Sequence, residues 1–190
     1  LPTLRHADSY LQGHPNMNLV PGVDMSTGSL GQGVSCAAGM AKGAKYLGQD
    51  INVYTLLGDG EIEEGEVWEA FMFAAHYKLD NLCVIIDLNG LQIDGPTEKV
   101  MNSAPVDAKM EAFGFNVITI DGHDYDQIES AFNAFRACTG RPTAILMHTT
   151  KGKGVSYMEN NVDWHGKAPN DAEYEVAMNE LRAAMAELEA

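Results

Sequence analysis

Basic residues are scarce in this chain of 190 residues: 12 lysines and arginines stand against 27 aspartates and glutamates, for a net charge of −15 at pH 7. A protein that grips nucleic acid needs a basic stripe to neutralise phosphates, so this balance argues against nucleic-acid partners. The overall field also repels an anionic ligand, and a site for one needs a metal ion or local cations. We expect most of the acidic residues to form a solvated surface.

Long apolar runs and paired cysteines are missing as well. No stretch approaches the roughly 20 continuous apolar residues that cross a membrane, and no secretory signal is visible. Cys36, Cys83 and Cys138 lie far apart and form no C-x-x-C pair. An odd number of cysteines in apolar surroundings indicates buried thiols in a reducing compartment. We therefore expect a cytoplasmic protein that does not bind a membrane.

Short apolar runs alternate with stretches of helical composition. Strands are expected at 51–57, 82–87, 115–121 and 142–149, and helices at 29–47, 66–79, 107–113 and 124–138. The run 82–87, LCVIID, is almost wholly apolar, as a strand buried on both faces should be. Strands that alternate with helices predict right-handed βαβ units, which gives a three-layer α/β/α fold with a mainly parallel sheet.

A last helix is expected at about 170–188, on an otherwise acidic stretch. Its apolar residues recur at helical spacing: Tyr174, Met178, Leu181, Met185 and Leu188. Such a stripe favours packing against the core, and a partner surface is the weaker alternative. No linker divides the chain, so residues 1–190 are expected to form a single domain. Because the chain opens without Met, we expect it to be a piece of something longer that lacks its N-terminal segment.

Polar residues stand where two of the expected strands end. Asp59 lies between two glycines directly after the strand at 51–57, and Asn89 lies just past the strand at 82–87. The 28 residues between the second glycine and Asn89 (61–88) have room for one βαβ crossover. The two strands can then be parallel neighbours about 4.8 Å apart. Because ligands bind beyond the carboxyl ends of the strands in open α/β sheets, we expect Asp59 and Asn89 to face a common point.

These residue types suit Mg²⁺ together with a diphosphate. Mg²⁺ prefers an octahedron of oxygens, commonly one or two carboxylates with phosphate oxygens and water. Gly58 and Gly60 let backbone N–H groups reach phosphate oxygens, and the helix that follows adds its positive end. A Gly-Asp-Gly turn alone is common turn chemistry. The preceding strand, the following helix and Asn89 together favour a ligand site.

Longer stretches resemble the transketolases. Gly-Asp-Gly followed by 28 residues and Asn is similar to the signature of thiamine-diphosphate enzymes. The resemblance is carried further by the stretches GHPNMNLVPGVDMSTGSLGQG, LLGDGEIEEGEVWEAFMFAAHYKLDNL, NGLQIDGPTE and TTKGKGVSYMENNVDWHGKAPND. It is greatest to the N-terminal subunit of the split, two-chain transketolases and covers nearly the whole chain. It implies the thiamine-diphosphate-binding fold of the domain that holds the diphosphate.

The resemblance implies thiamine diphosphate and Mg²⁺ (or Ca²⁺) as cofactors. Asp59 and Asn89 then ligate the metal through their side chains, and Leu91 does so through its backbone carbonyl. The residues that the resemblance places against the diphosphate are Gly58, Gly60 and Glu61, the last through its backbone.

Other positions take roles from the same resemblance. Gly28 and Leu30 contact the aminopyrimidine and the cofactor's rings. His14 is similar to a histidine that hydrogen-bonds ketose hydroxyls, and His165 to one that reaches the diphosphate and the reacting centre. Glu64 matches a carboxylate that meets its counterpart across a dimer interface.

Several polar residues keep two interpretations when they are considered without the family. His14 and His165 lie in irregular backbone, where functional groups gather, and imidazole suits proton transfer near neutral pH. Ordinary loop histidines fit them equally well. Lys151 and Lys153 either supply positive charge for phosphates or decorate a loop. His123 precedes an expected N-cap residue and is interpreted as part of a helix start.

The implied activity is two-carbon ketol transfer between ketose and aldose phosphates, in the pentose phosphate pathway. The resemblance places the pyrimidine-binding domain, the glutamate that activates the cofactor and the main sugar-phosphate contacts in a C-terminal partner subunit. It implies a heterotetramer, with self-association through the cofactor-domain interface. Two alternatives stay open. One is another thiamine-diphosphate enzyme, such as deoxyxylulose-phosphate synthase or a 2-oxoacid dehydrogenase component, and the other is a non-catalytic assembly subunit.

Overall fold

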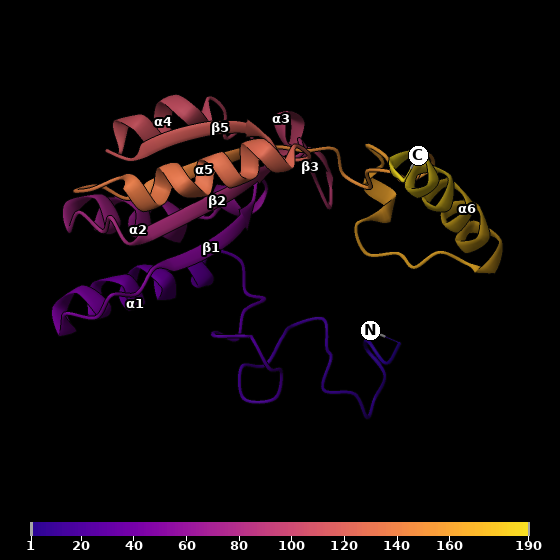
Figure 1. The fold of residues 1–190 in the computed structure, drawn as a ribbon, viewed down its shortest axis with the longest axis horizontal. Helices are drawn as coiled ribbons and strands as arrows, with labels where there is room; N and C mark the ends of the chain where they lie inside the picture. Colours follow the sequence, from indigo (N-terminus) through magenta and orange to yellow (C-terminus); the bar gives the residue numbers. More distant parts are fainter. Residues whose placement is uncertain (1, 190) are drawn as a thin grey trace.

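The computed structural model describes residues 2–189, with a parallel sheet at its centre (Figure 1). Its four strands are β1 (Val53–Gly58), β2 (Leu82–Leu88), β5 (Asn116–Asp121) and β6 (Thr143–His148). They lie in the order β1-β2-β6-β5, and every neighbouring pair is parallel. A separate two-stranded ribbon joins β3 (Leu91–Gln92) to β4 (Gly95–Pro96). The predicted α/β fold with a mainly parallel sheet is confirmed.

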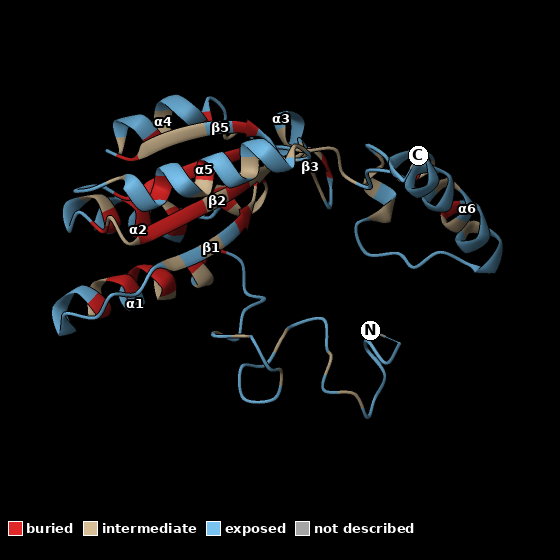
Figure 2. Cartoon of the chain, viewed as in Figure 1, coloured by how far each residue is buried: buried red, intermediate tan, exposed pale blue. Residues whose placement is uncertain are grey.

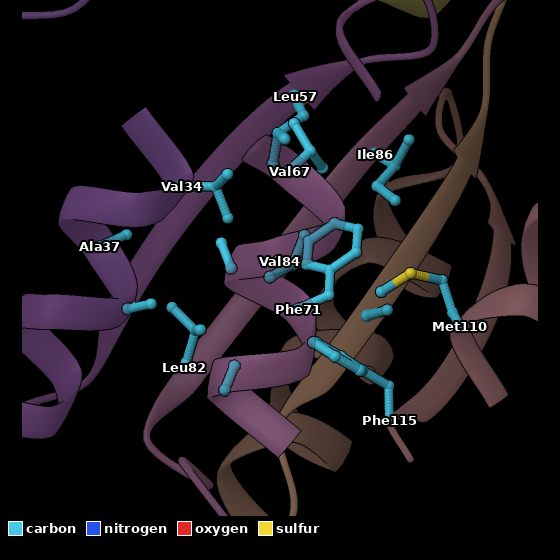
Figure 3. Packing of buried hydrophobic residues seen from close by; sticks show 14 of the residues in the cluster. Val34, Ala37, Leu57, Val67, Phe71, Leu82, Val84, Ile86, Met110 and Phe115 are labelled. Carbon is cyan, nitrogen blue, oxygen red and sulfur yellow. The ribbon is translucent and has the colours of Figure 1, made fainter. Parts of the chain in front are cut away.

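Helices cover both faces of the sheet. The helices are α1 (Gln32–Leu47), α2 (Gly65–His76), α3 (Thr97–Val100), α4 (Val106–Ala112), α5 (Tyr125–Ala137) and α6 (Asp171–Leu188). The larger core cluster joins α1, α2 and α4 to one face, where Phe71 packs edge-on against Phe115 (Figure 3). The smaller cluster joins α5 to the other face through Ala131 and Phe135.

Alternation along the strands explains the two clusters. In β2, Leu82, Val84 and Ile86 belong to the larger cluster, while Cys83 between them belongs to the smaller one. Successive strand residues point to opposite faces, so a strand buried on both faces must be apolar throughout. From β1 to β2 the chain moves one way along the sheet, and from β5 to β6 it moves back. Right-handed crossovers then place α2 and α5 on opposite faces.

The first helix begins later than the predicted range of 29–47. Gly31 has φ 84°, a left-handed conformation that cannot continue a helix, and α1 therefore begins at Gln32. Gly48, with φ 66°, ends the helix after Leu47. The glycines thus fix the length of α1 and the direction from which the chain enters it.

Strand β1 forms an outer edge of the sheet within the described residues. Tyr54 rests edge-on against Phe132 and Phe135 of α5, with ring centroids 5.8 and 5.4 Å away. Leu56, on the same face of the strand, is 66% exposed. Helix α5 therefore covers only part of this face at β1.

The segments that flank the sheet are different in character. Residues 2–31 contain no helix or strand, and Figure 2 shows this part of the chain almost entirely exposed. At the other end, α6 lies beyond the end of the sheet near which β3 is drawn (Figure 1). A short 3-10 helix, Val162–Trp164, precedes α6. No helix in residues 2–189 is long and apolar enough to span a membrane.

The expected packing of the α6 stripe against the core is wrong. Tyr174, Leu181, Met185 and Leu188 are exposed, and Ala177 is the buried residue of the helix. Contacts of α6 are made with the preceding segment instead: the Tyr157 hydroxyl donates to the Glu173 carbonyl at 2.7 Å, and the Ser156 N–H to the Glu180 carboxylate at 2.7 Å. The helix therefore lies away from the apolar layers of the sheet.

The cysteines follow the prediction only in part. Cys83 is fully buried in β2, and burial raises the pKa of its thiol to about 12, which keeps it protonated and unreactive. Cys36 and Cys138 are half-buried, and all three are free thiols.

Candidate functional site

The candidate site begins where β1 and β2 end side by side. Gly58, the last residue of β1, is the register partner of Asp87 in β2. Asp59 follows and is 4% exposed. The Gly60 N–H donates to Asp59 Oδ1 at 2.9 Å, and the Gly90 N–H donates to Oδ2 at 2.5 Å. Two backbone amides thus fix the orientation of a buried carboxylate at the carboxyl edge of the sheet.

The charge of Asp59 is poorly compensated by the protein. Burial raises the pKa of Asp59 above the ordinary carboxyl value, and the nearby Asp87 raises it further, against the opposing effect of the backbone donors. Among residues 2–189 the ion pairs are Lys45–Asp80 and Lys167–Glu173, and neither involves Asp59. A buried carboxylate beside a second one is stabilised by a cation.

Asn89 meets Asp59 through the residue between their loops. Its Nδ2 donates to Asp87 at 3.0 Å, and its Oδ1 accepts from the Leu91 N–H at 3.0 Å. Gly90, next in the chain, is the donor to Asp59. The structure therefore brings Asp59, Asn89 and Leu91 together, as the strand ends predict.

These residues fit a magnesium ion in the chemistry of their donors. Within the described chain no three His, Cys, Asp or Glu side chains form a metal cluster. A metal here depends on one carboxylate with an amide oxygen and a backbone carbonyl, and it keeps positions for phosphate oxygens. That set of hard oxygen donors is typical of Mg²⁺.

Glu61 does more than its backbone role would require. Its carboxylate accepts from the Gly31 N–H at 3.0 Å and from the Gly58 N–H at 3.2 Å. It thereby ties the start of α1 to the end of β1. Sequence reasoning missed this contact, because the glycine partners carry no side-chain signal.

Gly60 lies against the β3–β4 ribbon. A Cβ placed on it would be 2.8 Å from the Cβ of Gln92. Gln92 in turn donates to the Glu63 carboxylate at 2.8 and 2.9 Å. Gln92 is a second residue that sequence reasoning missed, and its position makes a side chain at residue 60 costly.

His14 lies next to Gly28, away from the sheet. Gly28 has φ 135°, and a Cβ on it would be 2.4 Å from the His14 ring. The two residues belong to an exposed loop, which borders a cavity of about 380 Å³ lined by His14, Ser26, Thr27, Gln32 and Cys36, among others. Leu30, two residues after Gly28, is 58% exposed. No hydrogen bond in residues 2–189 joins His14 to Asp59 or Asn89.

His165 lies on the C-terminal segment beside Lys151. The Lys151 Nζ is 3.3 Å from His165 Nδ1. Trp164, its neighbour, packs on Tyr157 at 5.0 Å between ring centroids and under the Lys167 ammonium at 4.2 Å. The hydrogen bonds of the described chain do not connect His165 directly to the residues around Asp59. Glu64 is exposed at the start of α2, and its contact across a dimer stays a prediction.

A parallel α/β sheet that ends in glycines, a buried carboxylate and an amide is the arrangement of an α/β domain that binds a phosphate-bearing ligand. Comparison with known proteins identifies the family within that class. The family described as transketolase, thiamine diphosphate binding domain, matches residues 1–186. The chain belongs to this family, and the resemblance seen in the sequence is confirmed.

Similar proteins carry transketolase names. One of the two subunits named for the apulose-4-phosphate transketolase of Actinobacillus succinogenes is 43% identical over 182 residues, covering 96% of this chain and 66% of that protein. The 6-deoxy-6-sulfo-D-fructose transketolase subunit SqwG of a Clostridium species is 41% identical, over 95% of this chain and 66% of that one. Human transketolase is 44% identical, over 88% of this chain and 26% of its own.

A solved structure supports the same family. The transketolase of Campylobacter jejuni superposes with a TM-score of 0.87 at 34% identity, over 94% of this chain and 29% of that one. The chain therefore spans just under two thirds of the subunits that it matches, and under one third of the single-chain enzymes.

Proposed function

We propose that this chain is the N-terminal, diphosphate-binding half of a transketolase, which transfers a two-carbon ketol unit between ketose and aldose phosphates. The observation that carries the proposal is the buried carboxylate of Asp59, which the Gly60 and Gly90 amides orient beside Asn89 in a chain of this family. A mere assembly subunit would have no need to keep a buried and uncompensated charge.

The proposed cofactors are Mg²⁺ and thiamine diphosphate. Asp59, Asn89 and the Leu91 carbonyl hold the metal, and the diphosphate lies against the backbone of Gly58, Gly60 and Glu61. Gly28 and Leu30 contact the rings of the cofactor. When bound, the cofactor supplies the carbanion chemistry at the ketose carbonyl.

The proposed contribution of the chain to that chemistry is position and proton handling. His14 hydrogen-bonds hydroxyls of the ketose, and His165 reaches the diphosphate and the reacting centre. Lys151, beside His165, adds positive charge that a −15 chain otherwise lacks at an anion site. Both histidines are exposed in this chain, so excluding water from the reaction requires a covering surface.

We propose that a partner subunit supplies that surface, with the pyrimidine-binding domain and the main sugar-phosphate contacts. The two similar split proteins are named as subunits. A heterotetramer that associates through the cofactor domains, with Glu64 at the interface, is the proposed assembly, and residues 1–190 act in it as one domain. The three free cysteines support the expected cytoplasmic location.

The substrate tail is the finer part of the proposal. Subunits that are 43% and 41% identical to this chain are named for a sugar phosphate and for a sulfo sugar. Overall identity in this half therefore does not separate the two tails. A panel of ketose donors with phosphate or sulfonate tails, assayed with pentose-phosphate acceptors, separates these substrates and tests the pathway assignment.

The decisive test is co-expression with a C-terminal transketolase subunit, followed by calorimetry with thiamine diphosphate and Mg²⁺. Replacing a metal ligand should cost more than the about 10–100-fold typical of second-shell changes, so Asp59→Ala should weaken cofactor binding at least about 100-fold. Glu129→Ala, on the exposed side of α5, is the matched control and should bind as the wild type does.

Unchanged affinity in Asp59→Ala would exclude the metal site. Cofactor binding without any ketol transfer, across the whole donor panel, would favour another thiamine-diphosphate activity.

A further inference from the structure

Two consecutive threonines at the end of β6 connect the strands on either side. The Thr149 hydroxyl donates to the Asp87 carboxylate of β2, and the Thr149 N–H donates to the Leu88 carbonyl at 3.4 Å. The Thr150 N–H turns the other way and donates to Nε2 of His123, just after β5, at 2.8 Å. His123 is thus the side chain that anchors the start of the loop after β6 on its β5 side.

The approach of the two loops is close enough to fix this contact. The Gly122 N–H donates to the His148 carbonyl at 2.8 Å. A Cβ on Gly122 would lie 2.5 Å from Thr149 Cγ2 and 3.1 Å from the Cβ of Met147. Glycine at this position lets the turn after β5 press against the end of β6, so the His123 ring reaches Thr150.

The anchored loop leads directly to the C-terminal segment. Lys151 follows Thr150, and its Nζ lies 3.3 Å from His165 Nδ1. Its carbonyl accepts from the Asn160 N–H at 2.9 Å. Residues 149–151 therefore link Asp87, which holds the Asn89 amide at 3.0 Å, to the segment that carries His165.

The hydrogen bond assigns a definite role to the imidazole ring. Nε2 accepts a proton from the backbone, so this nitrogen is unprotonated and the neutral ring carries its proton on Nδ1. A leucine cannot accept this bond. A glutamine can, because its side-chain oxygen reaches a position similar to that of Nε2.

We propose that His123 is a positioning residue: through Thr150 it fixes the loop that carries Lys151, and thereby sets Lys151 and His165 relative to the Asp59–Asn89 site. The inference rests on the proposed function, because it gives the loop a ligand to meet. His123 itself touches neither metal nor cofactor.

The first test uses the cofactor-free chain and compares His123→Leu with His123→Gln. Amide hydrogen exchange at Thr150, followed by NMR, should be about tenfold faster in the leucine variant and close to the wild-type rate in the glutamine variant. Because His123 is exposed, neither change should alter the exchange of buried amides in β2. Equal protection of Thr150 in the two variants would overturn the anchoring role.

The second test measures the affinity of the complex with the partner subunit for thiamine diphosphate and Mg²⁺. His123→Leu should weaken binding about three- to tenfold, and His123→Gln should restore it to within about twofold. Lys151→Met should weaken it at least as much, and the double variant His123→Leu/Lys151→Met should be no weaker than Lys151→Met alone, because both act through one group.

The outcomes separate this inference from the function on which it rests. If the wild-type complex binds the cofactor and His123→Leu binds it equally well, or if the two losses simply add, the positioning role is wrong and the proposed function stands. If the wild-type complex fails to bind thiamine diphosphate, both fall.

Discussion

The carboxyl edge of the sheet and the two flanking segments bring different kinds of residue to the proposed site. At the edge, Asp59 is buried, both of its oxygens accept from backbone amides, and Glu61 ties the strand end to α1. In the flanking segments, His14 and His165 are exposed on irregular backbone. The metal–diphosphate part is thus preformed by the fold, whereas the histidines wait on surfaces that something else must cover.

The difference shows how the labour of the site is divided. A metal and a diphosphate need fixed oxygens and amides, which strand ends with glycines provide at no entropic cost on binding. Contacts to a sugar that comes and goes suit loops that can adjust. Changes at the edge should therefore affect both stability and cofactor binding, while changes in the flanking segments should affect turnover alone.

The largest expected effect concerns Asp59 and pH. Its folded-state pKa is raised, so in the metal-free protein it contributes stability below its unfolded-state pKa, and this is lost as pH rises through the folded-state pKa. Mg²⁺ with thiamine diphosphate needs the ionised form and, at 100 times the Kd, adds about 2.7 kcal/mol near neutral pH. Thermal unfolding from about pH 7 down to about pH 4, values that span ordinary carboxyl titration, should show this gain shrinking as pH falls.

In Asp59→Asn the ligands should give little gain at any of these pH values. A full gain that persists at the acid end of the range would contradict the role of the ionised carboxylate.

A smaller effect is expected from crowding the same edge. Gly60→Ala brings a methyl group to 2.8 Å from the Cβ of Gln92. Overpacking of this kind costs about 1–3 kcal/mol, and the displaced amide should also weaken cofactor binding. Urea unfolding and calorimetry measure the two losses. Gly39→Ala in α1, where a Cβ meets nothing within 4 Å, is the matched control and should not destabilise the protein.

The flanking histidine should separate stability from turnover. His14→Ala should change the free energy of unfolding by less than about 0.5 kcal/mol, since the ring is exposed. Ketol transfer in the complex should nevertheless fall about 10²-fold or more, with cofactor affinity unchanged. His6→Ala, an exposed histidine of the same segment, should leave both quantities unchanged. A loss of stability in His14→Ala that matched the loss of rate would remove the contrast between the two regions.

The smallest effect is expected in α6. Met185→Gln should change the free energy of unfolding by less than about 0.5 kcal/mol, because Met185 is exposed, whereas Ala177→Glu places a charge in the buried position of the helix and should cost more. Chemical denaturation compares the two. If Met185→Gln instead prevents co-purification with the C-terminal subunit, the stripe is a partner surface, which was the weaker alternative.

The sequence predicted the parts of the molecule that local patterns determine. Strand β2 is apolar because it is buried on both faces, and the length between Gly60 and Asn89 allows one crossover. Those two facts, with the rule that parallel strands end at one edge, were enough to place Asp59 beside Asn89. The roles of the individual residues toward metal and cofactor remain predictions.

Long-range polar contacts escaped prediction. Glu61 bonds an amide 30 residues away at Gly31, and His123 accepts from Thr150, 27 residues further on. In both cases one partner is a backbone N–H, which looks the same in every sequence. The stripe of α6 failed for another reason: periodicity shows which residues share a face and does not show what covers that face.

The outer strand β1 has a consequence for handling the protein. Its sequence, VYTLLG, contains no charge, and an outer strand offers unused backbone donors and acceptors to any second strand that comes near. The net charge of −15 keeps copies apart at low ionic strength, but added salt shortens the reach of that repulsion to about 8 Å at 0.15 M. The colloidal behaviour of the isolated chain is thus set by buffer composition: dilute, low-salt solutions preserve it, and concentration in high salt invites edge-to-edge aggregation.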